Sequence, residues 1–253
     1  MWGTHRSSYY NTPNSHPTSL NAMATLQNKT VVVVGGSSGI GFAVALASLQ
    51  SLASLVIIAS SNKSRVEDAV ARLKAHKLPG KVRGEVLDAK NSEAVKVFAS
   101  GLGLVDHIVW TSGDVPEAHG GGLPFSNVDS VEEGQGIFTV RFWGPFILAK
   151  HAKFHPGGSL TLTSGLAGQR PFPGAPLGSS VTTALGGLTR GLAVDLAPVR
   201  VNLVCPGLID TELIEKMFGE QGDNVVEAFN GKTLLKRVGK PSECAEAYIF
   251  LMK

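Results

Sequence analysis

The stretch TVVVVGGSSGIGFAVALASLQ, residues 30–50, joins an apolar run to a glycine-rich turn and then to a segment with apolar residues at helical spacing. Four consecutive valines are typical of a strand that is buried on both faces. In the segment after the glycines, the residues that can face a core at this spacing are Ile40, Val44, Leu46 and Leu49. The stretch therefore predicts a strand, a tight turn and a helix, the beginning of a βαβ unit.

The same alternation continues along the rest of the chain. Further buried strands are predicted at 54–61, 80–90, 105–113, 158–165 and 199–207. Helices are predicted between them at 64–77, 92–103, 140–154 and 183–197. Apolar strands that alternate with helices indicate a parallel sheet covered on both faces. We therefore predict an α/β fold, a Rossmann-type doubly wound parallel sheet in a single domain.

Composition excludes several classes of protein. The chain has 253 residues, of which 43% are hydrophobic, enough for one large domain with a buried core. Its net charge of +3 is scattered, so neither nucleic acid nor a membrane is expected as a partner. Cys205 and Cys244 lie far apart without metal-ligand spacing, which predicts no bound metal and a reduced, cytoplasmic protein. No apolar run approaches the roughly 18 residues that span a bilayer.

Residues 1–22 differ from the rest in composition. They are polar, rich in Ser, Asn, Thr and Pro, and contain no acidic residue. We interpret them as a disordered leader or an artificial extension, with the NADP-binding domain argued below spanning residues 23–253. A mitochondrial transit peptide is the alternative, although a single arginine and the lack of an amphipathic helix argue against it.

The glycine-rich turn after the first strand points to a nucleotide. Gly35, Gly39 and Gly41 fall between a strand and a helix, where the chain must turn tightly and approach a ligand closely. Backbone N–H groups there can hold a pyrophosphate at the positive end of the helix dipole. The alternative is a glycine turn needed only for packing.

With these motifs the chain resembles the short-chain dehydrogenase/reductase family from Lys29 to Met252. The resemblance rests on GGSSGIG, LDAK, WTSG, TLTSGLAG and RVNLVCPGLIDT, with Val34 in place of the threonine of the family's TGxxxGxG. It implies a nicotinamide dinucleotide, with Asp88 near the adenine and the segment 206–211 along the nicotinamide. The implied cofactor contacts are Gly35, Ser37, Ser38, Gly39, Ile40, Gly41, Asp88, Ala89, Thr111, Ser112, Gly113, Pro206, Gly207, Ile209 and Thr211.

The end of the second strand distinguishes NAD from NADP. An acidic residue there would bind the ribose 2′-hydroxyl and repel a 2′-phosphate. The chain instead has ASSNKSR, in which Ser60, Ser61 and Asn62 can donate hydrogen bonds while Lys63 and Arg65 bring positive charge. We therefore predict NADP(H) as the cofactor. The alternative is that both cations belong to a solvated helix start.

The family's proton-transfer residues are replaced in this chain. The family carries a tyrosine thirteen positions after its serine and a lysine four beyond that, and counting from Ser164 these positions hold Leu177 and Val181. The family's asparagine, in a VNxxG pattern, is replaced by Arg141 in VRFWG. Because neither leucine nor valine can carry a proton, reduction of a ketone, which makes an alkoxide, lacks its usual acid.

Three residues are candidates for the chemistry. Arg141 can grip a carbonyl, carboxylate or amide oxygen of a substrate, or can be a structural ion pair. Ser164 can donate a hydrogen bond to substrate, or can be a plain serine at a strand end. Asp114, which follows a predicted strand, can pair with a cationic substrate or act as a base, or can cap a loop. His119 is a further possible proton donor, with a surface histidine as its alternative.

These departures resemble the fungal NADPH-dependent reductases that double as intramolecular Diels-Alderases in the synthesis of bridged prenylated indole alkaloids. We predict NADPH-dependent reduction of an iminium-type intermediate of natural-product biosynthesis, coupled or not to a [4+2] cyclisation. Hydride addition to a cationic C=N bond gives a neutral amine, so no proton has to arrive with the hydride. Two alternatives stay open: a carbonyl reductase with a relocated proton donor, and a non-catalytic NADP-binding scaffold.

The predicted partners are a small-molecule substrate and further copies of the same chain. A homo-oligomer, a dimer or a tetramer, is expected from the family. The segment LIEKMFGEQGDNVVEAFNGKT, residues 213–233, is polar enough to be mobile. It is predicted to be a lid over the substrate.

Overall fold

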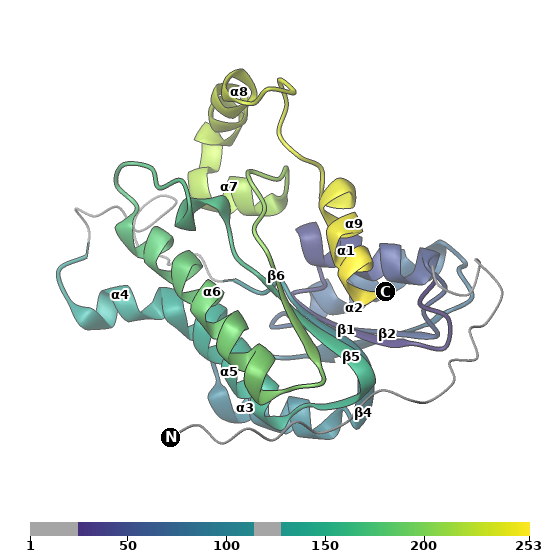
Figure 1. The fold of residues 1–253 in the computed structure, drawn as a ribbon. Coiled ribbons are helices and arrows are strands. Elements are labelled where there is room, and N and C mark those ends of the chain that lie inside the picture. Colours follow the sequence, from purple (N-terminus) through teal and green to yellow (C-terminus); the bar gives the residue numbers. More distant parts are fainter. Residues whose placement is uncertain (1–24, 114–127) are drawn as a thin grey trace, which may run out of the picture.

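Six parallel strands form one sheet in the order β3-β2-β1-β4-β5-β6, which confirms the predicted Rossmann-type α/β fold (Figure 1). The computed structural model describes residues 25–113 and 128–253. The predicted leader, Asp114 and His119 lie outside these residues. The strands are β1 (Thr30–Val34), β2 (Leu55–Ser60), β3 (Lys81–Val86), β4 (Leu104–Trp110), β5 (Lys153–Thr163) and β6 (Arg200–Val204).

Helices cover both faces of this sheet (Figure 1). Val31 and Val33 pack beneath α1, α2 and α9, whereas Val32 and Val34 pack beneath α3, α5 and α6. Four valines in a row are therefore required, since both faces of β1 are fully buried. The helices are α1 (Gly39–Gln50), α2 (Lys63–Ala75), α3 (Ser92–Gly101), α4 (Val131–Phe138), α5 (Gly144–His151), α6 (Pro176–Asp195), α7 (Glu212–Phe218), α8 (Gly222–Lys232) and α9 (Pro241–Met252), with a π-helical turn η2 (Thr139–Trp143) and 3₁₀ turns η3 (Leu166–Gly168) and η4 (Gly219–Gln221).

The strand order reverses at β1, which pairs with β2 on one side and β4 on the other. The chain therefore leaves β1 and β4 toward opposite sides of the sheet. In open α/β sheets, ligands bind in the crevice outside the carboxyl ends of the strands at such a reversal. The residues after β1 and after β4 consequently meet at one place.

Two helices differ from their predicted ranges. The predicted helix 140–154 divides into the π-helical turn η2 and the helix α5, and β5 already begins at Lys153. The predicted helix 183–197 begins seven residues earlier, at Pro176. Proline at the first turn of a helix loses no hydrogen bond, so α6 starts there despite the small residues that follow.

Within the described residues, no helix is both long and apolar enough to cross a membrane. Six helices, α1, α2, α3, α5, α6 and α9, lie instead against the two faces of the sheet, where their apolar residues are buried.

His107 is a titratable side chain inside β4, and only 2% of it is exposed. Its Nδ1 lies 2.9 Å from the Ser159 hydroxyl on β5, and its Nε2 has no hydrogen-bond partner among the described residues. Burial disfavours the imidazolium and lowers the pKa of His107 from 6.5 to about 4, although Asp106 opposes this shift. Between pH 6.5 and pH 4 the folded chain therefore keeps His107 neutral, whereas the unfolded chain protonates it.

Acidification is expected to destabilise the fold by about 3 kcal/mol through His107, since each unit of pKa difference corresponds to about 1.4 kcal/mol. The unfolded chain binds the proton near pH 6.5 and the folded chain only near pH 4, so the loss begins below 6.5 and is complete near 4. Urea denaturation across this range measures it. His107→Gln should remove most of the fall in unfolding free energy between pH 6.5 and pH 4. An equal fall in both proteins would refute the assignment of this loss to His107.

Candidate functional site

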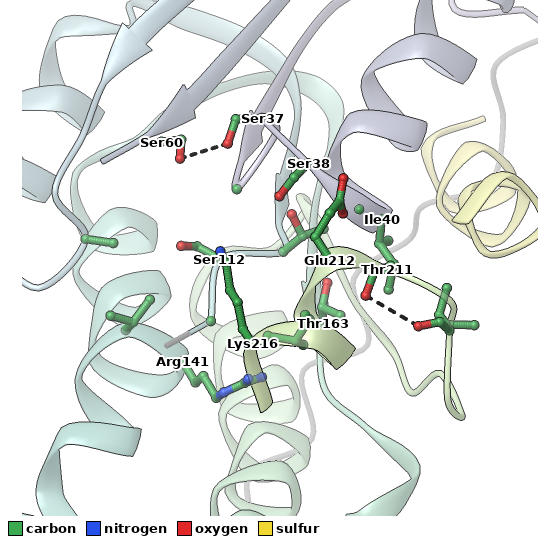
Figure 2. Close-up of a pocket in the computed structure, with 18 of the residues that line it drawn as sticks. Ser37, Ser38, Ile40, Ser60, Ser112, Arg141, Thr163, Thr211, Glu212 and Lys216 are labelled. Carbon is green, nitrogen blue, oxygen red and sulfur yellow. Dashed lines mark hydrogen bonds between the residues drawn. The ribbon is translucent and has the colours of Figure 1, made fainter. Parts of the chain in front are cut away.

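A pocket of about 360 Å³ lies at the carboxyl edge of the sheet, between the strand ends and α7 (Figure 2). The structure brings most of the sequence-predicted residues into its wall. Those that line it are Gly35, Ser37, Ser38, Gly39, Ile40, Ser60, Ser61, Asp88, Ala89, Thr111, Ser112, Gly113, Arg141, Ser164, Pro206, Gly207, Ile209 and Thr211. Gly41, Asn62 and Lys63 do not line it.

The glycine turn is formed by backbone that a side chain would obstruct. Gly35 has φ +91°, and a Cβ there would lie 2.6 Å from the Ser112 nitrogen. Gly39, at the first residue of α1, has φ +52°. The turn therefore exposes backbone at the N-terminus of α1, a geometry that fits a pyrophosphate.

Gly41 serves packing and does not line the pocket. A Cβ on Gly41 would collide with the carbonyl oxygen of Gly35. This close approach lets α1 begin directly above the end of β1. Gly35 and Gly39 thus let the chain turn into α1, and Gly41 lets α1 pack closely against the end of β1.

The end of β2 joins the glycine turn through two serines. The Ser37 hydroxyl donates to the Ser60 hydroxyl over 3.0 Å, and Ser37 is almost fully buried. Arg65, in the first turn of α2, also lines the pocket. It brings positive charge to this end of the pocket.

Asn62 and Lys63 have local roles in the structure. The Asn62 side chain caps α2 by accepting a hydrogen bond from the Arg65 backbone N–H at 2.9 Å. Lys63 is exposed and lies 3.9 Å from Glu67, one turn along the same helix. The Asn62 side chain is thus engaged in helix capping, Lys63 lies in solvent beside Glu67, and Arg65 is the α2 residue that lines the pocket.

Arg141 comes from the π-helical turn η2, and Trp110 accounts for this turn. The Gly144 N–H donates to the Thr139 carbonyl, five residues back, so the Val140 carbonyl is left without that helical partner. The buried Trp110 indole N–H donates to this Val140 carbonyl over 3.1 Å. A residue with any side chain at Gly144 would collide with the Trp110 ring. The end of β4 thus places Arg141 at the pocket.

The Arg141 guanidinium lies directly over Gly113. A Cβ on Gly113 would meet its Cζ at 2.7 Å and its two terminal nitrogens at 2.8 and 2.9 Å. Arg141 is half-buried and lines the pocket beside Ser164. Only a residue without a side chain at position 113 leaves room for the guanidinium where it lies.

Ser164 uses its hydroxyl hydrogen within the protein. It donates to the Thr182 carbonyl in α6 at 2.8 Å, which leaves its oxygen lone pairs available as acceptors, and Ser164 lines the pocket. The neighbouring Thr163 hydroxyl lies 2.8 Å from the Tyr248 hydroxyl. Tyr248 is a fully buried residue of α9 that does not line the pocket, and burial raises its pKa. It is therefore not a proton donor to this pocket.

The first half of α6 presents apolar side chains near Ser164. Val181 is buried against Ile137 of α4, and Leu177 packs with Phe138 and Phe142. Because Ser164 bonds to the residue after Val181, this helix segment lies directly behind the Ser164 end of the pocket. Neither side chain is among the residues that line the pocket, so this hydrocarbon lies behind the pocket wall.

Several wall residues were missed in the sequence, above all those of α7. Glu212 and Lys216 line the pocket from α7, and Lys90 and Thr163 line it from the ends of β3 and β5. The polar composition of 213–233 predicted only a mobile lid, whereas the segment forms two helices. The helical spacing of Glu212 and Lys216 was the signal available in the sequence.

The segment that carries α7 and α8 is closed at its base. The Asp210 N–H donates to the Gly239 carbonyl at 2.9 Å, and the Gly239 N–H donates to the Leu208 carbonyl at 3.1 Å. Beyond this clasp, α7 and α8 pack chiefly on each other and on η4, and α8 projects away from the sheet (Figure 1). Such a segment can move on its base without disturbing the sheet.

Comparison with known proteins places this geometry among dehydrogenases. A family model described as an SDR-like Rossmann domain matches residues 22–253. The short-chain dehydrogenase/reductase ucsE of Acremonium sp is 39% identical over 247 residues, which cover 90% of this chain and 90% of that protein. The short-chain dehydrogenase/reductase malC of Malbranchea aurantiaca is 33% identical over 242 residues, covering 90% of this chain and 89% of that protein.

Solved structures agree with this comparison. The MalC Reductase/Diels-Alderase from Malbranchea aurantiaca is similar with a TM-score of 0.80 at 32% identity, over 90% of this chain and 91% of that chain. A small-chain dehydrogenase in complex with NADPH is similar with a TM-score of 0.70 at 26% identity, over 90% of this chain and 92% of that chain.

Replacing Gly41 by alanine is expected to cost about 1–3 kcal/mol of unfolding free energy, because the new methyl group meets backbone that cannot rotate away. The displaced turn should also weaken binding of NADPH. Urea denaturation and a fluorescence titration measure the two effects. Gly101→Ala, at the end of α3 with nothing within 4 Å, is the matched control and should leave both unchanged. Equal behaviour of the two variants would refute the packing role of Gly41.

Proposed function

The chain belongs to the short-chain dehydrogenase/reductase family, and from this premise we propose that it reduces an iminium-type intermediate of natural-product biosynthesis with NADPH. As a member of this family it is an oxidoreductase whose cofactor is a nicotinamide dinucleotide. The observation that carries the proposal is the apolar packing of Leu177 and Val181 behind Ser164, in the segment where the family carries its tyrosine and lysine. The reaction must therefore proceed without the phenol and ammonium groups of the family.

The pocket residues fit NADPH along its length. The turn Ser37–Ile40 would hold the pyrophosphate, and the segment Pro206–Thr211 would border the nicotinamide, which supplies a hydride when bound. Ser60 and Arg65 would hold the 2′-phosphate, because one offers a hydroxyl and the other a charged fork. No acidic residue stands at the end of β2 to bind a free 2′-hydroxyl.

The chemistry of the pocket favours a cationic C=N bond over a ketone. A ketone that accepts hydride becomes an alkoxide and needs an acid, whose loss costs about 10²- to 10⁴-fold in rate. A C=N cation that accepts hydride becomes a neutral amine. Leu177 and Val181, which stand in place of the family's tyrosine and lysine, therefore do not lower the rate of this reaction. With valine in place of lysine, the site also lacks a positive charge that would repel the substrate.

Arg141 serves this reaction by holding an oxygen of the substrate. Its planar guanidinium presents paired donors, which match a carboxylate or an amide carbonyl better than they match a cation. Contact with Gly113 fixes its position, so the oxygen is held in one orientation relative to the reacting carbon. Ser164, with lone pairs still available, accepts or positions a second polar group of the substrate.

A [4+2] cyclisation is compatible with the same pocket. A cycloaddition needs no proton transfer, and holding diene and dienophile in one pose supplies several kcal/mol. The similarity to a reductase/Diels-Alderase over 90% of this chain supports this second step. We propose that the reduced product, still held in this pocket, is the species that cyclises.

Incubation with NADPH and matched cyclic substrates tests the proposed function. We expect an amine from a cyclic iminium salt at a kcat/KM about 100-fold or more above that for the ketone of the same ring, because only the ketone needs an acid. Loss of NADPH absorbance and mass spectrometry of the product measure both. An alcohol as the main product would establish a carbonyl reductase, and binding without turnover a scaffold, and either outcome would overturn the proposal.

Arg141→Gln in the same assay is expected to lower kcat/KM for the iminium salt about 10- to 100-fold, the value of a hydrogen bond to a charged group. The Kd for NADPH should not change. Arg141→Lys is the matched control, since it keeps the charge but not the paired donors, and should recover only part of the loss. Full activity of Arg141→Gln would refute the role of Arg141.

Arg65→Gln is expected to weaken NADPH binding about tenfold and leave NADH binding unchanged, because the two cofactors differ only in the 2′-phosphate. Equilibrium titration with each cofactor measures the change. Lys63→Gln is the matched control, since Lys63 lies outside the pocket and should have no effect on either cofactor. If Lys63→Gln weakened NADPH binding as much as Arg65→Gln does, the assignment of Arg65 to the 2′-phosphate would be contradicted.

A further inference from the structure

Positive charge is unevenly distributed along the pocket wall. Within the described residues, the cations that line it are Arg65, Lys90, Arg141 and Lys216. Arg65 and Lys90 follow β2 and β3, at the proposed adenine end, and Arg141 is fixed over Gly113. The glycine turn between these two ends contributes no cation of its own.

The first turn of α7 lies directly over the glycine turn. A Cβ on Gly39 would be 3.2 Å from the Thr211 Cγ2 and 3.6 Å from a carboxylate oxygen of Glu212. The start of α7 and the start of α1 therefore face each other across the place where the pyrophosphate is proposed to bind. The Glu212 carboxylate is next to that place and opposes a second negative group there.

Lys216 stands one helical turn after Glu212 on the same face of α7. Helical side chains lean toward the N-terminus of their helix, which here means toward the glycine turn. Figure 2 shows Lys216 extending from α7 across the cleft in the direction of Ser112. The Ser112 backbone is itself packed on Gly35, the first residue of the turn. In the described part of the chain Lys216 makes no ion pair.

We propose that Lys216 binds the pyrophosphate of the cofactor from the lid, opposite the N–H groups of the glycine turn. The inference rests on the dinucleotide cofactor of the proposed function and not on its substrate. When the pyrophosphate arrives, it attracts Lys216 and repels Glu212, so α7 settles over the cofactor. Occupancy of the cofactor site and closure of the lid are thereby coupled through two charges of opposite sign on one helix.

Equilibrium titrations of three probes test this proposal in the absence of substrate. NADPH and NADH both carry the pyrophosphate, whereas adenosine 2′-monophosphate carries only the 2′-phosphate. Lys216→Met is expected to weaken NADPH and NADH about tenfold each and leave adenosine 2′-monophosphate unchanged. Glu212→Gln is expected to tighten NADPH and NADH. Lys232→Met, on α8 of the same lid and outside the pocket, is the matched control without effect.

Opposite effects of the two α7 variants would not arise from a merely structural role. The proposal is overturned if Lys216→Met leaves the affinities for NADPH and NADH unchanged, or if it weakens all three probes alike. It is also overturned if the wild-type protein binds neither dinucleotide. Preference for NADH, or failure to reduce an iminium salt, would refute the proposed function and leave this inference standing, because the pyrophosphate is common to both cofactors.

Discussion

All six strands run in the same direction, and the pocket depends on this constraint. Parallel strands end at one edge, so the segments after β1, β2, β3, β4, β5 and β6 each contribute to the same wall although they are far apart in sequence. The collision that any side chain on Gly41 would make with the Gly35 carbonyl shows how tightly the first of these segments turns. The tight turn aims the N-terminus of α1 at the pocket, where its dipole favours a phosphate.

A second constraint comes from the middle of the sheet. The buried Trp110 is the last residue of β4, and its indole N–H donates to the Val140 carbonyl, which takes this carbonyl out of the α-helical pattern. The π turn that results carries Arg141 to the pocket, with Gly113 and Gly144 both leaving room for large side chains. Loss of the indole donor would leave the Val140 carbonyl buried without a partner. The arginine, the tryptophan and the two glycines therefore form one structural unit.

The sequence predicts the fold and the strand-end residues well, because both follow from short-range patterns. Apolar runs locate the strands, and a parallel sheet then brings the residues after them together. The sequence names Lys63 and Arg65 together as cations near the cofactor, and only the structure separates them, because the way α2 packs places Arg65 in the pocket wall and leaves Lys63 outside it. Lys216 was missed for a related reason, since no strand end marks its place and only the packing of α7 over Gly39 gives it a direction. The roles of these residues stay predictions.

The charges of the pocket also restrict how a cationic substrate can lie. Two unit charges 4 Å apart repel by about 4 kcal/mol at the effective dielectric constant of a protein surface, so an iminium nitrogen cannot rest against the Arg141 guanidinium. In the proposed reaction the arginine would face an oxygen of the substrate, and the nitrogen would lie away from the guanidinium, among uncharged groups or near an acidic group. Hydrocarbon leaves a cation poorly solvated, and hydride addition, which neutralises it, relieves that cost. In the proposed reaction, a site without the family's proton donor would thus still allow the reduction of a cation, whereas it would slow that of a ketone.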